Sequence, residues 1–355
     1  MDVSAPNPVK PPPPSFRELF TPKLVTLLRE GYGRRELTAD AFAGLTVAIV
    51  ALPLSMAIAV ASGLSPEKGL FTAIIAGFLI SALGGSRFQI GGPAGAFIVL
   101  IAAIVERHGY DGLVLATAMA GLMMMAAGFL RLGTYIKYIP LPVTVGFTAG
   151  IAVIILTSQV KELLGLDIAQ EPAALGLKLA AIWGAIGTIN PAAVLLSVLA
   201  VGLIVGVRRF RPHWPGMLIA VVVTALLAAL LGLEVTTIGS RFGDVPRMLP
   251  LPSFPAFDLA KVRAVLPDAI AIALLGAIES LLSAVVADGM SGRKHRSNCE
   301  LVAQGVANVA SVTFGGMCAT GTIARTATNV RAGAVSPVPG MLHAAYLLLF
   351  LLVAA

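Results

Sequence analysis

The chain has 355 residues, of which 57% are hydrophobic and 12% are charged, and its mean hydropathy is +0.91. Soluble domains carry about 25% charged residues, so a soluble fold of this length could not bury the apolar side chains present. Lipid must therefore cover much of the surface. The net charge of +7 comes from basic residues scattered over short loops, without a continuous basic face, which argues against a nucleic-acid partner.

The first 36 residues have the composition of a cytoplasmic segment. A stretch of prolines from Pro11 to Pro14 precedes apolar residues at helical spacing between Phe16 and Leu28. This pattern predicts a short amphipathic helix that lies on the membrane surface. No basic residue leads into an apolar run at the start, so we expect no cleaved signal peptide.

About eleven apolar segments follow, which predicts an all-α polytopic membrane protein in the lipid bilayer. Several approach the ~20 residues that a membrane-spanning helix needs, but 93–105 and 320–331 are short. The segments lie at about 41–62, 66–83, 93–105, 112–130, 141–160, 188–207, 214–232, 264–287, 299–313, 320–331 and 338–355.

The distribution of lysine and arginine predicts the orientation. With the N-terminus inside, fifteen of these residues fall in inside loops and eight in outside loops. Cytoplasmic loops carry the excess of basic residues, so we expect a cytoplasmic N-terminus in the inner (plasma) membrane. The long loop at about 233–263 would then face the outside.

Two parts of the sequence repeat one pattern. Gly84-Gly85 ends one apolar segment and leads through extended residues into the short segment near Pro93. Gly315-Gly316 does the same before the short segment near Thr322. The two short segments are expected to run in opposite directions. Paired interrupted helices of this kind point to an inverted-repeat transporter with a site at mid-membrane.

Two ionisable residues fall inside apolar segments. Glu279 lies within 269–287, and Arg325 follows Gly321 in a short segment. A charge at the bilayer centre costs about 2.5–3.5 kcal/mol on insertion scales, so it normally faces a cavity or a partner. Arg325 could attract an anion and Glu279 could be a coupling carboxylate. The alternative is that the two form a buried structural salt bridge.

An anion site in this region needs few side chains. Two helix N-termini that face each other present unpaired backbone N–H groups and the positive ends of two dipoles. The small residues Ala94, Gly95 and Ala324 would let an anion approach the backbone, and Thr320 and Thr322 add hydroxyl groups.

The sequence predicts no cofactor. It contains no metal-ligand spacing, no nucleophile elbow and no phosphate-binding loop, so neither an enzyme nor a nucleotide-driven pump is expected. Cys299 and Cys318 are too few for a disulfide framework and are expected to be buried free thiols. His295 and His343 are interpreted as structural residues.

A set of motifs extends over nearly all of residues 36–350. It comprises Ala43-Gly44-Leu45 to Pro53, Ala61-Ser62-Gly63-Leu64-Ser65-Pro66, Gly69-Leu70, Gly92-Pro93-Ala94, Val145-Gly146-Phe147-Thr148-Ala149-Gly150, Glu279-Ser280-Leu281-Leu282-Ser283-Ala284, Asp288, Gly292, His295, Asn298, Glu300, Ala303-Gln304-Gly305, Asn308, Phe314-Gly315-Gly316, Thr320-Gly321, Ala324-Arg325-Thr326 and Asn329. In these motifs the sequence resembles the sulfate permease (SulP) family, the bacterial relatives of the mammalian sulfate/anion exchangers and prestin.

The resemblance implies two inverted seven-helix repeats, divided into a core and a gate domain. It assigns 1–36 to a cytoplasmic N-terminal segment and 37–135 to core helices 1–4. It assigns 136–263 to gate helices 5–7 with the external loop, and 264–355 to core helices 8–11 of a second, incomplete repeat. Relatives continue with three more helices and a cytoplasmic STAS domain, which are absent from these 355 residues.

The resemblance also implies the residues of the site. The substrate would lie between the third and tenth helices, with Glu279 and Ser283 of the eighth helix as ion-coupling residues. Glutamate at position 279 favours protons over sodium, since sodium-coupled relatives carry aspartate there. Leu54 stands where many relatives carry glutamine. The implied substrate-binding residues are Pro93, Ala94, Gly95, Ala96, Thr322, Ile323, Ala324 and Arg325.

The leading hypothesis is therefore secondary transport of a small anion, coupled to protons. The anion could be sulfate, bicarbonate, chloride or a dicarboxylate, because a site made by helix dipoles does not identify it. An uncoupled exchanger or channel, and a non-transporting membrane scaffold, are the alternatives. A homodimeric assembly is an open expectation.

Overall fold

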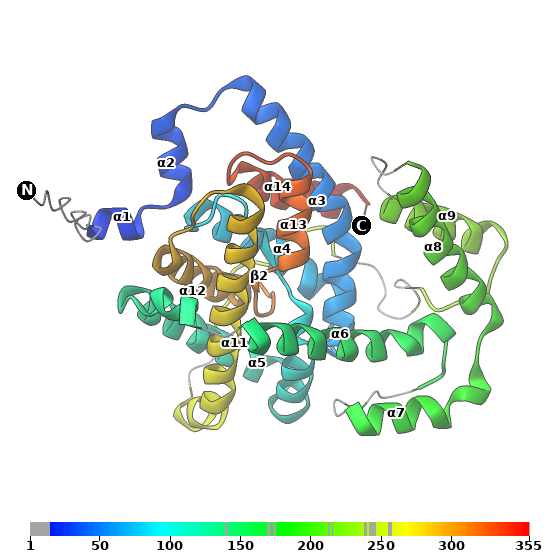
Figure 1. Ribbon diagram of the computed structural model, residues 1–355. Helices are drawn as coiled ribbons and strands as arrows, with labels where there is room; N and C mark the ends of the chain where they lie inside the picture. The colour runs from blue at the N-terminus through cyan, green and yellow to red at the C-terminus, as the bar shows by residue number, and fades with distance from the viewer. Residues whose placement is uncertain are drawn as a thin grey trace, which may run out of the picture.

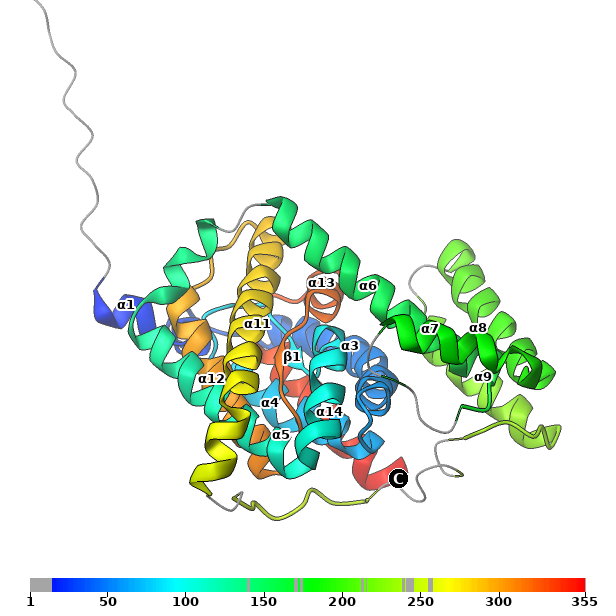
Figure 2. The same ribbon diagram turned by 90° about the horizontal axis from the view of Figure 1, so that it is seen from below.

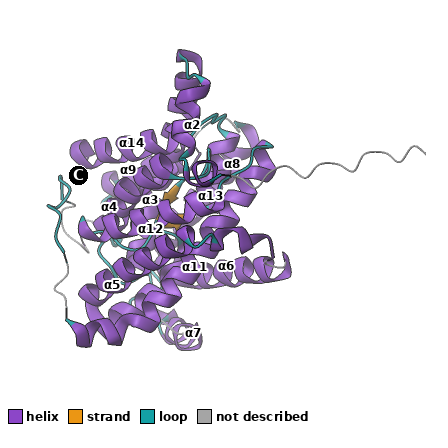
Figure 3. Ribbon diagram, turned by 90° about the vertical axis from the view of Figure 1, so that its left-hand side faces the viewer, coloured by secondary structure: helices purple, strands orange, loops and turns teal. Residues whose placement is uncertain are grey.

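The structure is a computed structural model that describes residues 15–138, 141–168, 172, 175–211, 214, 216–237, 240, 246–254 and 258–354. Within these residues the regular secondary structure is helical apart from one pair of two-residue strands (Figures 1 and 3). The predicted fold class, an all-α polytopic protein, is confirmed.

The helices and strands follow one another in this order. The first half contains α1 (Phe16–Phe20), α2 (Lys23–Glu30), α3 (Arg34–Ala61), α4 (Pro66–Leu83), β1 (Gly91–Gly92), the 3₁₀ helix η1 (Gly95–Phe97), α5 (Ile98–Phe129), η2 (Leu132–Tyr138) and α6 (Leu141–Leu164). The second half contains α7 (Leu175–Gly184), η3 (Ile186–Thr188), α8 (Pro191–Phe210), α9 (Gly216–Leu230), α11 (Leu259–Ser291), α12 (Ser297–Thr313), β2 (Thr320–Gly321), α13 (Ile323–Arg331) and α14 (Val338–Ala354).

Five of the described helices are long and apolar enough to cross a membrane. They are Arg34–Ala61, Pro66–Leu83, Gly95–Phe129, Pro191–Phe210 and Leu259–Ser291. Shorter apolar helices occur at Leu175–Gly184, Ile219–Leu230 and Val338–Val353. Together with the family assignment below, these helices make the chain a membrane protein.

The predicted segments overlap the described helices, with several differences. α5 covers two of them, 93–105 and 112–130, and α11 extends beyond the expected 264–287 at both ends. α3 begins at Arg34, earlier than the expected 41. The N-terminal helix is two helices, because Pro22 has an extended backbone between α1 and α2. α7 was not predicted, because Lys178 interrupts its apolar run.

The two interrupted segments meet inside the protein. β1 and β2 pair antiparallel, with Gly91 opposite Gly321 and Gly92 opposite Thr320. Figure 3 shows these strands enclosed by helices. Antiparallel strands send their following helices in opposite directions, as the sequence pattern predicted. α13 has only nine residues, and the first part of α5 stops at Gly109, whose φ of 68° is left-handed and breaks the helix.

The extended backbone before α13 is held by side chains of neighbouring helices. Asn308 donates to the carbonyl of Ala319 and accepts from its N–H, both at 2.8 Å. Thr72 accepts from the N–H of Met317, and Ser311 donates to the carbonyl of the same residue, both at 2.7 Å. Non-helical backbone at membrane depth requires such partners, because hydrocarbon offers none.

The extended backbone around β1 is held in the same way. The Glu300 carboxylate accepts from the N–H groups of Gly85 and Ser86 at 2.9 and 3.0 Å. Thr326 accepts from the N–H of Ile90 at 3.1 Å, and Asn329 donates to the carbonyl of Phe88 at 2.9 Å. These polar residues belong to the sequence motifs, and their observed role is to satisfy the interrupted backbone.

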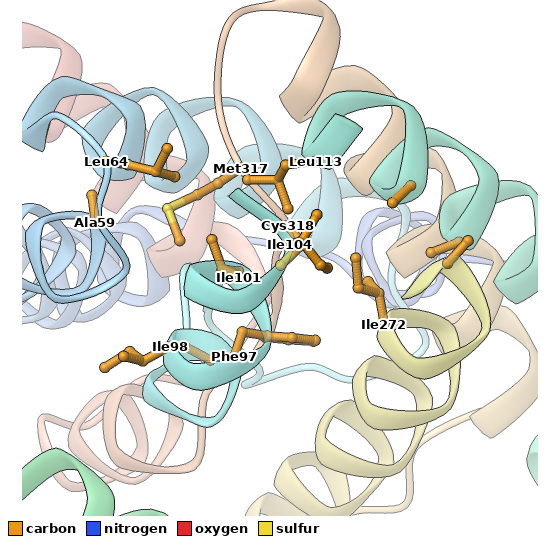
Figure 4. Packing of buried hydrophobic residues seen from close by; sticks show 14 of the residues in the cluster. Ala59, Leu64, Phe97, Ile98, Ile101, Ile104, Leu113, Ile272, Met317 and Cys318 are labelled. Atoms are coloured by element: carbon orange, nitrogen blue, oxygen red, sulfur yellow. The ribbon is translucent and has the colours of Figure 1, made fainter. Parts of the chain in front are cut away.

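The main hydrophobic core surrounds the first part of α5. Phe97, Ile101 and Ile104 are fully buried there against Ile272 of α11 and the Met317–Cys318 backbone segment (Figure 4). Cys299 and Cys318 are free and buried, as expected. This packing fixes the direction in which the first part of α5 leaves the β1–β2 strand pair.

α7, α8 and α9 lie to one side of the main helical bundle, and α6 runs towards them from it (Figures 1 and 2). No residue in the apolar window of α8 is fully buried within the described protein, and the helix packs against α9 and α6. The proposed division into core and gate domains stays a prediction.

The N-terminal helices are fastened to the bundle. Arg296 donates to the Thr21 carbonyl and to the Thr26 hydroxyl, both at 2.8 Å. Arg87 pairs with Glu30 at 2.5 Å, and this hydrogen bond lowers the pKa of the Glu30 carboxyl. α1 and α2 are therefore docked on α12 and the α4–β1 loop.

Candidate anion-binding site

A cavity of about 400 Å³ lies at the N-termini of the two interrupted segments. Five parts of the chain form its wall: α3, the β1–α5 junction, α6, α11 and the start of α13. It is lined by Leu54, Ala57, Ile58, Pro93, Ala94, Gly95, Ala96, Ile98, Ile155, Gln159, Glu279, Leu282, Thr322, Ile323, Ala324 and Arg325. All eight residues expected at the substrate, and Glu279, are therefore brought together.

Arg325 is the positive group of this cavity. It is only 1% exposed, yet the described protein contains no carboxylate paired with it. One guanidinium nitrogen, Nη2, donates to the Ser55 hydroxyl at 3.1 Å and to the Pro93 carbonyl at 3.4 Å. The Nε and Nη1 atoms have no hydrogen-bond partner. Two donors of a buried cation thus remain available to a ligand.

Gly92 allows the Arg325 guanidinium to approach the backbone of β1. A Cβ atom at position 92 would collide with Nη1 of Arg325. Ser55 donates in turn to the Ala51 carbonyl at 2.6 Å, which fixes the hydroxyl that supports Nη2. The guanidinium is therefore oriented by α3 and by β1, which are far from Arg325 in the sequence.

Glu279 provides the carboxylate of the cavity. It is half-buried on α11, and its Oε2 atom is buried without a hydrogen-bond partner. Among the described residues no ion pair or hydrogen bond joins Glu279 to Arg325. The structure therefore lacks the direct Glu279–Arg325 salt bridge that was the alternative interpretation of the sequence.

Neither helix N-terminus at the cavity is capped by a side chain. Ala94 precedes η1 and Thr322 precedes α13, and neither side chain accepts from its helix. The Thr322 hydroxyl instead donates to the Ile90 carbonyl at 3.3 Å. The first N–H groups of a helix have no partner within the helix, and the residues that begin both helices line the same cavity as Arg325.

Two predicted residues lie elsewhere. Ser283 does not line the cavity, because its hydroxyl donates to the Thr326 hydroxyl at 3.0 Å. Thr320 is also absent from the wall, and it donates to the Gly276 carbonyl at 3.1 Å. Both hydroxyls stabilise the packing of α11 against the second interrupted segment.

The sequence did not reveal the contribution of α6. Ile155 and Gln159 line the cavity from this helix, one turn apart. Gln159 was missed because it is a single polar residue near the end of an apolar helix, where the simplest interpretation is an interfacial position. Leu54 lines the cavity as the resemblance implied.

A second cavity of about 610 Å³ lies against α4, the second part of α5 and residues 246–254. It contains both signs of charge, from Lys68, Lys261, Glu67 and Asp111, but none of the expected site residues. Within the described residues no group of three or more His, Cys, Asp or Glu side chains is arranged to hold a metal ion.

Comparison with known proteins agrees with this architecture. The model of the sulfate permease family matches residues 37–355. YvdB of Bacillus subtilis (strain 168), named provisionally as a sulfate transporter, is 46% identical over 92% of this chain and 62% of its own length. The bicarbonate transporter BicA of Synechocystis is 33% identical over 90% of this chain and 58% of its own length.

Solved structures share the fold. The transmembrane domain of a cyanobacterial BicA superimposes with a TM-score of 0.80 at 33% identity, covering 91% of this chain and 84% of that chain. The murine solute carrier 26 family member A9 anion transporter, in its inward-facing state, gives a TM-score of 0.81 at 17% identity, covering 93% of this chain and 59% of that chain. The chain spans about three fifths of the length of YvdB and BicA. On the family match and on the identity to these relatives, the chain belongs to the sulfate permease family.

Proposed function

We propose that the protein is a secondary transporter that binds a small anion between the N-termini of α5 and α13 and couples its movement to protons. One observation carries the proposal: a buried, unpaired Arg325 donor set and two uncapped helix N-termini share a single cavity. The relatives' names, which include sulfate and bicarbonate transporters, support an anion as cargo.

The anion supplies the hydrogen-bond acceptors that the donors of the cavity lack within the protein. Buried hydrogen-bond donors that lack a partner are costly in a low-dielectric interior. A bound anion accepts from Nε or Nη1 of Arg325 and from the backbone N–H groups of the two helices. Charge-assisted hydrogen bonds of this kind are stronger than neutral ones. One arginine and two helix dipoles are therefore sufficient to bind a small anion.

Glu279 couples this binding to a proton. Its carboxylate shares the cavity with the anion, and two negative charges in a poorly solvated space repel each other. Anion binding therefore favours the protonated carboxyl, and linkage requires protonation to favour the anion by the same factor. Arg325, a monovalent anion and a protonated Glu279 together carry no net charge, which lowers the cost of moving them through the membrane.

The test compares the complete gene product with its Glu279→Gln variant in liposomes. The substitution keeps the size of the side chain and removes the titratable group. We expect the variant to lose uptake driven by an inward proton gradient while it retains anion exchange. Glu279→Asp is the matched control: it keeps a carboxyl group and should still couple uptake to a cation gradient, of protons or of sodium.

Each outcome has a distinct meaning. If Glu279→Gln still accumulates the anion against its gradient, proton coupling through Glu279 is wrong. If the wild-type protein exchanges anions and ignores the proton gradient, it is an uncoupled exchanger or channel. If it moves none of sulfate, bicarbonate, chloride or a dicarboxylate, the transport proposal is wrong and the scaffold alternative remains.

A further inference from the structure

Gln159 has a hydrogen-bonding capacity that the described protein does not use. It is one of four polar side chains in the cavity wall, with Glu279, Thr322 and Arg325. Among the described residues its side-chain amide makes no hydrogen bond. Gln159 is half-buried, and an amide that lacks a protein partner is available to a ligand.

The position of Gln159 relative to the anion site is set by Ile155. These residues are four positions apart on α6, so they lie on the same face of the helix. The Ile155 side chain packs directly on Gly95, because a Cβ atom at Gly95 would collide with it. α6 is therefore held against the first turn of the helix that presents its N–H groups to the cavity, and Gln159 lies one turn further along.

α6 is also the one described helix of the predicted gate domain, 136–263, that reaches the cavity wall. The other polar contributions come from α11 and from the start of α13, which the family resemblance assigns to the core domain. An anion held at Arg325 thus faces a single gate-side hydrogen-bonding group among the described residues.

We propose that Gln159 is the α6-side ligand of the anion and determines its selectivity for oxyanions over halides. This inference rests on the proposed function of the cavity. An oxyanion has several oxygen atoms, so one can accept from Arg325 and the helix N-termini while another accepts from the Gln159 amide. A halide is a single atom and cannot bridge the two walls, so its binding depends on the Arg325 side alone.

The experiment measures the binding of sulfate, bicarbonate, chloride and bromide to the purified complete protein and to its Gln159→Leu variant. A lost hydrogen bond to a charged ligand corresponds to about a tenfold or greater loss of affinity. We expect this loss for the oxyanion that the wild type binds, with halide affinity changed less than about twofold. Gln159→Glu should weaken oxyanion binding further, because the added carboxylate repels the anion.

Leu156→Ala is the matched control, since Leu156 lies on the same helix and is 65% exposed. It should leave both classes of anion unaffected. Equal losses for oxyanions and halides in Gln159→Leu, or no loss for either, would overturn the role of Gln159. Melting temperatures without anion show whether a variant is folded. A wild-type protein that binds no anion would instead refute the proposed function itself.

Discussion

Asn308 of α12 and Ala319, the residue before β2, are joined by two hydrogen bonds of 2.8 Å, one in each direction. Asn308 is fully buried, and its amide reproduces the pairing that a neighbouring strand would give to this stretch of backbone. The same side chain also donates to the Gln304 carbonyl at 2.8 Å. A side chain of α12 thus satisfies the hydrogen bonds of non-helical backbone at membrane depth, where lipid offers no partner.

Replacing Asn308 with leucine should destabilise the protein. The variant leaves both the N–H and the carbonyl of Ala319 without partners, at about 1–3 kcal/mol for each buried group. Thermal melting in detergent should fall by several degrees. Thr328→Val is the control, because the Thr328 hydroxyl bonds only within its own helix, to the Ala324 carbonyl. Equal melting temperatures for Asn308→Leu and wild type would contradict the stabilising role of Asn308.

Gly92→Ala should weaken anion binding. The new methyl group would occupy the space of Nη1 of Arg325 and force the guanidinium away from β1. Anion affinity, measured by titration of the purified protein, should therefore fall. Gly289→Ala is the control, since a Cβ atom at that position of α11 meets no neighbour within 4 Å. Unchanged affinity in Gly92→Ala would show that the guanidinium position does not matter to the ligand.

Arg325→Gln should lower anion affinity by about 10- to 100-fold, the loss expected for charge-assisted hydrogen bonds. Arg325→Lys should lie between this variant and the wild type, because lysine keeps the charge and loses the fork of donors. Melting temperatures in the absence of anion separate binding from folding. The assigned role of Arg325 would be refuted by a folded Gln variant that binds and transports the anion normally.

Most of the fold could be predicted because lipid imposes simple rules on the sequence. A segment such as 66–83 must be apolar and long enough to span, and it coincides with α4. The interruptions were also visible, as repeated glycines before Pro93 and Thr322. α7 was missed because Lys178 interrupts its apolar run, and a charged residue argues against a membrane-spanning segment.

The site could be predicted only where the sequence places an ionisable residue in an apolar segment, because burying a charge in the membrane costs free energy. Arg325 and Glu279 are conspicuous in apolar segments, and both line the cavity. Ser283 lies outside the cavity lining, one helical turn from Glu279, and its hydroxyl donates to Thr326 of α13; its ion-coupling role stays a prediction. Gln159 was not found, since its importance arises from the packing of Ile155 on Gly95, residues that are 60 positions apart and share no local pattern.

The most direct test of the account is the location of the bound anion. A structure of the complete protein with its transported anion, or with selenate in place of sulfate, would locate the ligand by its density or its anomalous signal. We predict an anion within hydrogen-bond distance of the Arg325 guanidinium and of the backbone N–H groups that begin η1 and α13. An anion that binds away from these groups, with the cavity empty under saturating conditions, would contradict the account.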